Sequence, residues 1–220
     1  SGIGESAIGA RIDDLMRLAN PTVGTAAHPG QTDVRITAKG ESEAEALALI
    51  APVEAELRLR LGDFIFGVDQ ESIGDVVSHL LAERGRRLAL VETVTQGQLA
   101  HDLARAVDGR GALAGSVILP DADALSTALG VPADVSQEAA ERAAEAVRRA
   151  YGADLGLAIL GPRDPGAPDA PPVFMSLSVG GRARNGVPRP GRSGVSGQGW
   201  LIHLALDLVR RELLGLPAPE

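Results

Sequence analysis

The stretch LALVETVTQGQLAHDLARAV, residues 88–107, decides the fold of the larger part of this chain. An apolar run ends at Glu92, two threonines follow, and after Gly97 the apolar residues recur at helical spacing. This pattern predicts a buried strand that passes through a short loop into a helix. Thr93 and Thr95 then lie beside the free N–H groups of that helix, where an anion or a developing oxyanion is favoured.

The two hydroxyl groups of this loop have two interpretations. Threonine is a good N-cap, so capping of the helix by Thr95 is the commoner role. A nucleophile would need a base as well. Lys39 is the only lysine of the chain, which excludes a serine–lysine type of pair here. His101 lies six residues beyond Thr95, roughly 9 Å along a helix, which favours a structural histidine over a general base.

The residues around this loop alternate between strand and helix patterns. Such alternation predicts an α/β fold, with a sheet covered by helices on both faces. We expect strands over 86–93, 112–120, 153–161 and 171–181. We expect helices over 72–85, 96–107, 121–131, 136–152 and 200–215.

Two loops of this part could contact a ligand. Residues 160–173 are rich in proline and glycine, and Arg163 and Asp164 are candidate contacts, although an internal ion pair is the commoner outcome. Residues 180–199 have almost no apolar content and are predicted to be a mobile loop. Their four arginines could close over a phosphate or stay solvated: Arg182, Arg184, Arg189 and Arg192.

The first 68 residues read as a small α+β unit, and residues 69–220 as the α/β unit. In the small unit we expect a helix over 4–19, a turn-rich extended stretch over 20–30 and a strand over 32–40. A long helix over 42–62 and a short strand-like segment over 63–69 complete it.

Composition narrows the classes of function. The chain has 220 residues, of which 45% are hydrophobic but only 2% aromatic, so the core must be aliphatic. The net charge of −8 argues against nucleic-acid binding. Cysteine is absent, which excludes disulfides and thiol catalysis. No two histidines stand at metal-ligand spacing, so we expect no metal and no cofactor. No apolar run of about 18 residues and no signal peptide is visible, so we expect a cytoplasmic protein.

Several motifs resemble the competence/damage-inducible CinA family. The segments GIGES, NPTVGTAAHPGQTDVRITAKG and EAELRLRLGDFIFG are similar to its small KH-like domain. RRLALVETVTQGQLAHDLA and LGVPADVSQEAAERAAEAVRRAYGADLGLAILGP are similar to its nicotinamide-nucleotide amidase domain. The resemblance implies a three-layer α/β/α sandwich with a mixed sheet, and a molybdopterin-binding-like domain ahead of this chain. It also implies homodimerisation, to which the apolar closing helix could contribute, and a pyridine nucleotide as ligand.

The resemblance also assigns site residues. The family's amidase has a nucleophilic serine in A-E-S-C-T-G-G, assisted by the tyrosine and lysine of Y-S-N-E-A-K, with a threonine of T-G-I-A-G-P in the site. These four positions fall on Thr93, Pro120, Leu125 and Leu160. The neighbouring ligand-binding positions fall on Glu92, Thr95, Gln96, Gly97 and Gly161.

These substitutions separate two hypotheses. Leucine cannot take a proton and the methyl group of Thr93 crowds the attack, so the first hypothesis is a degenerate amidase that serves as a binding or assembly module. The alternative is an active amidohydrolase on nicotinamide mononucleotide or a related amide. In that case Thr93 would be the nucleophile, with Glu92, Asp121 or Asp123 as the base. A third possibility places the activity in the missing N-terminal domain, with this part only dimerising.

Overall fold

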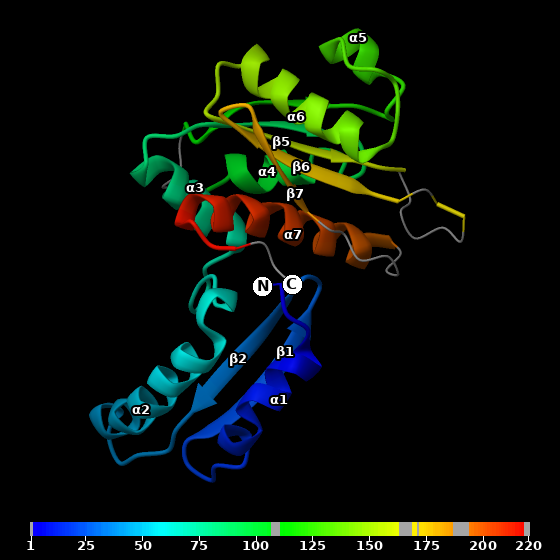
Figure 1. Ribbon diagram of the computed structural model, residues 1–220. Helices are drawn as coiled ribbons and strands as arrows, with labels where there is room; N and C mark the ends of the chain where they lie inside the picture. Colours follow the sequence, from blue (N-terminus) through cyan, green and yellow to red (C-terminus); the bar gives the residue numbers. More distant parts are fainter. Residues whose placement is uncertain (1, 107–110, 163–168, 171, 187–193, 218–220) are drawn as a thin grey trace. The chain divides into compact units, whose positions relative to one another are not determined.

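The computed structural model describes residues 2–106, 111–162, 169–170, 172–186 and 194–217, without the side chains of 194–196. The chain forms two compact units that divide between Phe66 and Gly67. Each unit is described by itself below, and Figure 1 shows the elements of both.

The small unit consists of one hairpin and two long helices (Figure 1). Its elements are α1 (Glu5–Met16), β1 (Thr22–His28), β2 (Gln31–Thr37), α2 (Glu43–Leu61) and the 3-10 turn η1 (Gly62–Phe64). The strands pair antiparallel, from Thr22 opposite Thr37 to His28 opposite Gln31. Apolar residues at helical spacing in α1 and α2 meet in one core, which includes Ile12, Val53 and Leu57.

Two predictions for the small unit need correction. The stretch 20–30, expected to be turn-rich and extended, is extended as the strand β1, whose pairing with β2 was not predicted. The expected strand over 63–69 does not form. Its start is a 3-10 turn, closed by the hydrogen bond from the amide of Ile65 to the carbonyl of Gly62.

The large unit contains a five-stranded mixed sheet with the order β4-β3-β5-β6-β7. The strands β3 (Leu88–Glu92), β4 (Leu113–Ile118) and β5 (Leu155–Leu160) run parallel to one another. The strands β6 (Phe174–Val179) and β7 (Arg182–Gly186) continue the sheet antiparallel. Gly180 and Gly181, both with positive φ, form the tight turn that makes this hairpin possible.

Helices cover both faces of this sheet, as expected for a three-layer α/β/α sandwich (Figure 1). On one face lie α5 (Leu125–Leu129) and α6 (Gln137–Ala150), and on the other α3 (Ile73–Glu83), α4 (Gln98–Ala104) and α7 (Gly194–Leu214). Ser136 caps α6, since its hydroxyl accepts a hydrogen bond from the amide of Ala139 at 3.1 Å. None of the helices in the described ranges is both long and apolar enough to cross a membrane.

The predicted mobile loop over 180–199 is also wrong in part. Residues 182–186 are the strand β7, and α7 begins at Gly194, six residues earlier than expected. β7 is an edge strand, so its mostly polar, exposed residues carried no apolar pattern. Arg182 and Arg184 bind the carboxylate of Glu212 on α7, at 2.7 and 3.2 Å, which gives them a structural role.

Candidate functional site

The candidate site lies at the carboxyl ends of β3 and β5. The chain passes from β3 to β4 on one side of β3, and returns to β5 on the other side. Such a switch point in the connections is where α/β sheets commonly bind ligands. The loop after β3 and Gly161 after β5 meet there.

The hydroxyl group of Thr93 is buried and fully engaged. Thr93 is 1% exposed, and its Oγ1 donates to the carbonyl oxygen of Gly161 at 3.0 Å and accepts from the amide of Gly161 at 2.9 Å. The backbone amide of Thr93 donates to the carbonyl of Ile159 at 3.1 Å. The strands β3 and β5 pair through their backbones up to Glu92 and Ile159. Just beyond that pair, the Thr93 hydroxyl makes the two hydrogen bonds to Gly161 that backbone groups make within the sheet.

Glu92 places a carboxylate against the first turn of α4. Its Oε2 accepts hydrogen bonds from the hydroxyl of Thr95 (2.6 Å) and the amides of Gly97 (3.2 Å) and Leu99 (3.3 Å), and its Oε1 from the amide of Ala100 (2.9 Å). Glu92 is fully buried. The amides that could have bound a ligand anion thus already bind the protein's own carboxylate, which the helix dipole also favours.

The prediction that Thr95 caps α4 is therefore wrong. The N-cap of α4 is Gly97, with no side-chain cap, and the hydroxyl of Thr95 donates to Glu92 instead of accepting from an amide. Glu92 is the residue whose role the sequence analysis missed. An acidic residue at the end of a strand and shortly before a helix was the available signal.

Two residues of the loop after β3, Gln96 and Gly97, have positive φ. Gly97 has φ +87°, and a Cβ there would lie 2.8 Å from Cδ1 of Ile118, so only glycine fits without movement. Gln96 has φ +53°, in the left-handed region that a residue with a side chain adopts at a cost. Gln96 is exposed, beside the site and outside its hydrogen bonds.

Two of the four positions assigned by the resemblance lie in the hydrophobic core. Leu125 and Leu160 are both fully buried and belong to one cluster between the sheet and α6. Pro120 is exposed at the end of β4. Apolar packing thus occupies the two places where the resemblance puts a lysine and a threonine.

None of the candidate bases is hydrogen-bonded to the Thr93 side chain in the described ranges. Asp121 and Asp123 are exposed, and Asp121 accepts from the amide of Ala124 at 3.3 Å. In the described ranges, the hydrogen bonds of the Thr93 side chain go to Gly161 and to no carboxylate. His101 is exposed on α4.

The remaining candidates are histidines of the described residues and loop residues outside them. His28 and His79 each lie beside one acidic residue, Asp33 and Glu83, at 3.1 and 3.2 Å. Among the residues that the structure describes, no cluster of three or more metal-ligating side chains occurs. The candidate contacts at 163 and 164, and those at 189 and 192, lie outside the described residues.

A buried charge cluster on α7 was also missed, because the closing helix reads as apolar. Asp207 binds Nε of Arg210 (2.8 Å) and Nε of Arg211 (2.9 Å), and all three are at most 2% exposed. Burial opposes ionisation of Asp207, but the two arginines hold its pKa below the usual value. His203, one turn earlier, has its pKa lowered to about 4 by burial. The spacing i, i+3, i+4 of Asp207 and its arginines was the available signal.

Comparison with known proteins supports the resemblance along the chain. Residues 1–67 match the damage-inducible protein CinA KH domain, and residues 70–183 match the CinA C-terminal domain. CinA-like proteins from Desulfovibrio desulfuricans and Frankia casuarinae are each 36% identical, over 98% and 100% of this chain. The chain spans about half of their length, 54% in both cases.

Solved structures agree on the fold of the larger unit. A CinA superfamily protein from Escherichia coli superposes with a TM-score of 0.56 at 19% identity, over 69% of this chain and 98% of that protein. A competence/damage-inducible protein from Agrobacterium tumefaciens gives 0.55 at 17% identity, over 67% and 99%. At these identities the likeness concerns the fold alone.

Proposed function

The chain belongs to the CinA family, and from this premise we propose that its amidase-like unit does not hydrolyse amides and serves as a binding or assembly module. The observation that carries the proposal is the state of the Thr93 hydroxyl. Its proton is directed at the carbonyl of Gly161 and its lone pair accepts from the amide of the same residue. A hydroxyl nucleophile needs its proton directed at a base, and no base is hydrogen-bonded to Thr93 in the described ranges.

The surroundings of Thr93 support the same conclusion. Developing negative charge on an amide oxygen needs free donors at the right place. At the start of α4 the amides of Gly97, Leu99 and Ala100 bind Glu92, and the amide of Gln98 donates to the carbonyl of Thr95 at 3.0 Å. Glu92 itself is held by these bonds, so its use as the base would first require them to break.

Packing provides a third support. Removing a positioned general base alone typically lowers a rate by two to four orders of magnitude. Here the position that the resemblance gives to the lysine is Leu125, fully buried among apolar side chains. Because leucine has no titratable group, no rotamer of Leu125 can accept a proton from Thr93.

The decisive experiment measures ammonia and nicotinic acid mononucleotide after incubation of the full chain with nicotinamide mononucleotide. The wild-type chain and the variant Thr93→Ala are expected to give the same background rate. A wild-type rate at least tenfold above that of Thr93→Ala would establish the active amidohydrolase instead. Asp121→Asn and Glu92→Gln then identify its base, since only the variant that lacks the base should lose the rate.

Binding without turnover is tested separately by calorimetry with nicotinamide mononucleotide, the simplest pyridine nucleotide. The proposed cytoplasmic location and an N-terminal molybdopterin-binding-like domain in the longer protein are further parts of this proposal. They rest on the resemblance, and both are open to test on the full-length protein.

A further inference from the structure

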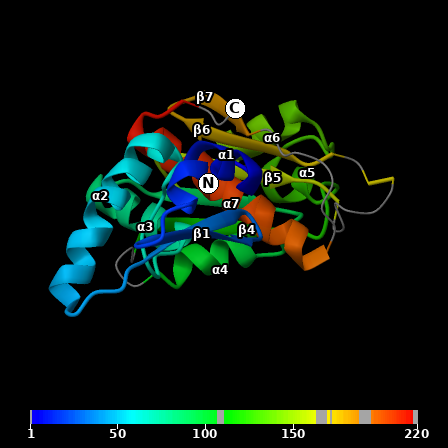
Figure 2. The same cartoon turned by 90° about the horizontal axis from the view of Figure 1, so that it is seen from below.

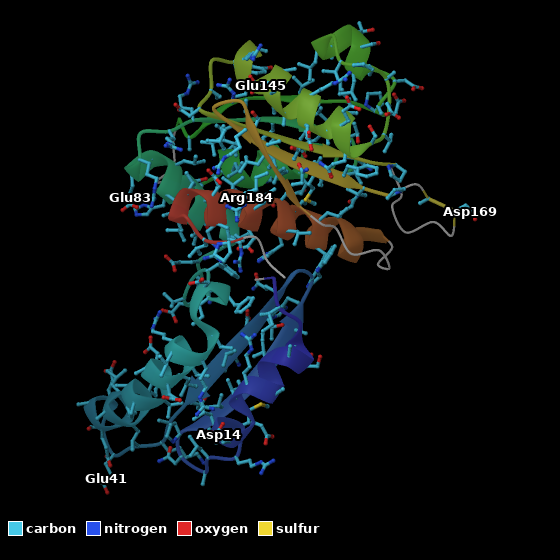
Figure 3. The ribbon with its side chains drawn as sticks, viewed as in Figure 1. Asp14, Glu41, Glu83, Glu145, Asp169 and Arg184 are labelled. Carbon is cyan, nitrogen blue, oxygen red and sulfur yellow. The ribbon has the colours of Figure 1, made fainter. Side chains whose placement is uncertain are left out.

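A row of polar side chains lies between α6 and the antiparallel strands β6 and β7. The helix runs along β6 in both views of the chain (Figures 1 and 2). At one end of the row, Nε2 of Gln137 donates to the carbonyl of Met175 at 3.1 Å. At the other end, the hydroxyl of Ser178 donates to Glu145, which is labelled on α6 in Figure 3, at 2.6 Å.

Two polar residues face each other between these contacts. Counting back from the contact of Glu145 with Ser178, one helical turn leads to Glu141 and two strand positions lead to Ser176. These steps are about 6 Å along the helix and about 6.6 Å along the strand, so the two residues stay level with each other. Alternate residues of a strand share a face, so Ser176 points to α6 as Ser178 does.

Ser176 carries a hydroxyl group that is buried and makes no hydrogen bond. The residue is 0% exposed, and its Oγ has no partner among the described residues. Buried polar groups nearly always have a hydrogen-bond partner, because a buried group without one costs free energy. A polar partner from outside the polypeptide is therefore favoured at this oxygen.

Two further polar side chains lie beside this hydroxyl. Asn185 of β7 is directly opposite Ser176 in the ladder, so the two side chains share a face with Cβ atoms about 4.5–5.5 Å apart. Nδ2 of Asn185 donates to Oε1 of Glu141 at 2.7 Å. Glu141 is half-buried and forms no ion pair in the described ranges, whereas Glu138 and Glu145 of the same helix each bind an arginine.

We propose that Ser176, Glu141 and Asn185 bind one monovalent cation of the size of Na⁺ between α6 and the hairpin of β6 and β7. The ligands are the hydroxyl oxygen, the carboxylate, and the amide oxygen Oδ1 once the Asn185 amide turns over. Nitrogen and oxygen of an amide are similar in size, so this turn exchanges only the bond of Nδ2 to Glu141 for a bond to the cation.

The chemistry of the three ligands favours a single positive charge. All the donors are oxygen atoms, which hard cations prefer, and one carboxylate balances one charge. Zinc and calcium sites need histidine, cysteine or several acidic side chains, and no cluster of that kind occurs in the described ranges. The cation would join α6 to the edge strand β7 at a place where the polypeptide leaves a buried hydroxyl without a partner.

Thermal unfolding of the full chain tests for the cation. The chain has one tryptophan, Trp200 on α7, so its fluorescence reports on the large unit. The cation gain is the unfolding midpoint in NaCl minus that in choline chloride of equal ionic strength, where screening is the same but choline is too large to bind. A gain of about 3–6 °C is expected once Na⁺ is about tenfold above its dissociation constant. Equal midpoints in the two salts would overturn the proposal and leave a water molecule as the partner of Ser176.

Two variants locate the site. Ser176→Ala and Glu141→Gln should each abolish the cation gain, because each removes one ligand. The matched control is Glu138→Gln, at an exposed position of the same helix, which should keep the gain of the wild type. Any change that Ser176→Ala makes to stability itself is the same in both salts and does not enter the gain. A full gain in Ser176→Ala or Glu141→Gln would place the cation elsewhere and contradict the proposal.

Asn185→Asp tests the site in the opposite direction. The new carboxylate lies beside Glu141, so the midpoint in choline chloride should fall through repulsion of like charges. The same carboxylate is a stronger ligand than an amide oxygen, so the cation gain should exceed that of the wild type. A lower midpoint in both salts with no larger gain would contradict the proposal.

These results are separate from the catalytic question. In the described ranges none of the substituted residues is hydrogen-bonded to Thr93 or Glu92. Hydrolysis of nicotinamide mononucleotide would overturn the proposed function and leave the cation site standing. An inactive chain without a cation gain would do the reverse.

Discussion

Thr93 shows how a side chain can replace a piece of backbone. Its hydroxyl group accepts from the amide of Gly161 and donates to the carbonyl of the same residue. Both backbone groups are buried, and each would cost free energy if it were left without a partner. The residue that the family resemblance gives as a nucleophile is therefore explained here by stability.

The first prediction concerns this hydroxyl. Thr93→Val keeps the shape but leaves the amide and the carbonyl of Gly161 without partners, and should lower the free energy of unfolding by about 1–3 kcal/mol. Thr93→Ser keeps both hydrogen bonds and is the matched control, with an expected loss of about 1 kcal/mol for the missing methyl group. Urea unfolding measures both. Equal stability of Thr93→Val and the wild type would show that the bridge is not needed.

The second prediction concerns the position to which the resemblance assigns a lysine. Leu125→Lys would place an ammonium group in the apolar cluster beside α6. An uncompensated buried charge costs about 3–5 kcal/mol, so the variant should be strongly destabilised. Leu125→Met keeps the volume and should cost less than about 1.5 kcal/mol. If thermal unfolding gives similar midpoints for the two variants, the position can still hold a lysine and the argument from packing fails.

At the scale of elements, the contact between α6 and β5 depends on Gly156. A Cβ at this position would lie 2.0 Å from the carbonyl oxygen of Ala144, in the backbone of α6. Since that oxygen belongs to the helix itself, the whole element would have to move. The close approach buries the alanines on the sheet-facing side of α6, among them Ala140, Ala143 and Ala144.

The third prediction follows from this approach. Gly156→Ala should destabilise the large unit by several kcal/mol, beyond the 1–3 kcal/mol of ordinary overpacking, or prevent its folding. Gly9→Ala in α1 is the control. A Cβ there meets nothing within 4 Å, and alanine favours a helix by about 1 kcal/mol, so this variant should be as stable as the wild type or more so. Circular dichroism melting curves compare the two, and a Gly156→Ala protein with a wild-type curve would contradict the prediction.

A second contact of α6 is polar. Glu145, labelled on α6 in Figure 3, binds Arg148 and Arg149 of its own helix and accepts from the hydroxyl of Ser178 on β6 at 2.6 Å. These bonds, that of Arg148 first, lower the pKa of Glu145 from 4.5 to about 2, although burial acts in the opposite direction. The ionised carboxylate thus joins the helix to the antiparallel part of the sheet.

The fourth prediction is the pH dependence that follows. The pKa of Glu145 is lower in the folded chain than in the unfolded chain, so the unfolded chain binds more protons as the pH falls. The stabilisation by Glu145 is complete above about pH 4.5 and is lost as the pH falls from there to about 2. Urea unfolding at several pH values should therefore show a smaller loss over this range for Glu145→Gln than for the wild type. Parallel curves for the two proteins would contradict the prediction.

At the scale of the whole molecule, the chain combines two units with different requirements. The large unit covers its sheet on both faces with its own helices. The small unit has a two-stranded sheet and leaves one apolar face of α2 in solvent. A unit of fewer than 70 residues buries a limited core, and association is one way in which small domains gain stability.

The strength of the apolar pattern decided how much of the fold could be predicted. Residues 88–91 and 155–160 are continuous runs without a polar side chain, and their strands are confirmed, as are the helices α3 and α6 that precede them. The strands β1 and β7 were missed. Each has a partner on one side only, and their glycines and exposed polar residues give no alternation. Edge strands owe their conformation to the neighbouring strand, which lies outside any local window.

The sequence by itself determined the alternation of strands and helices, the loop after β3 and the residues in it, because periodicity and turn residues act over a few positions. The tertiary structure alone decided what that loop does. Thr93 meets Gly161 across 68 positions of chain, and whether the first amides of α4 bind a ligand or Glu92 depends on how the loop folds back. A polar group bonds to whichever partner the fold brings within about 3 Å. Local sequence patterns do not predict which distant residue that partner is.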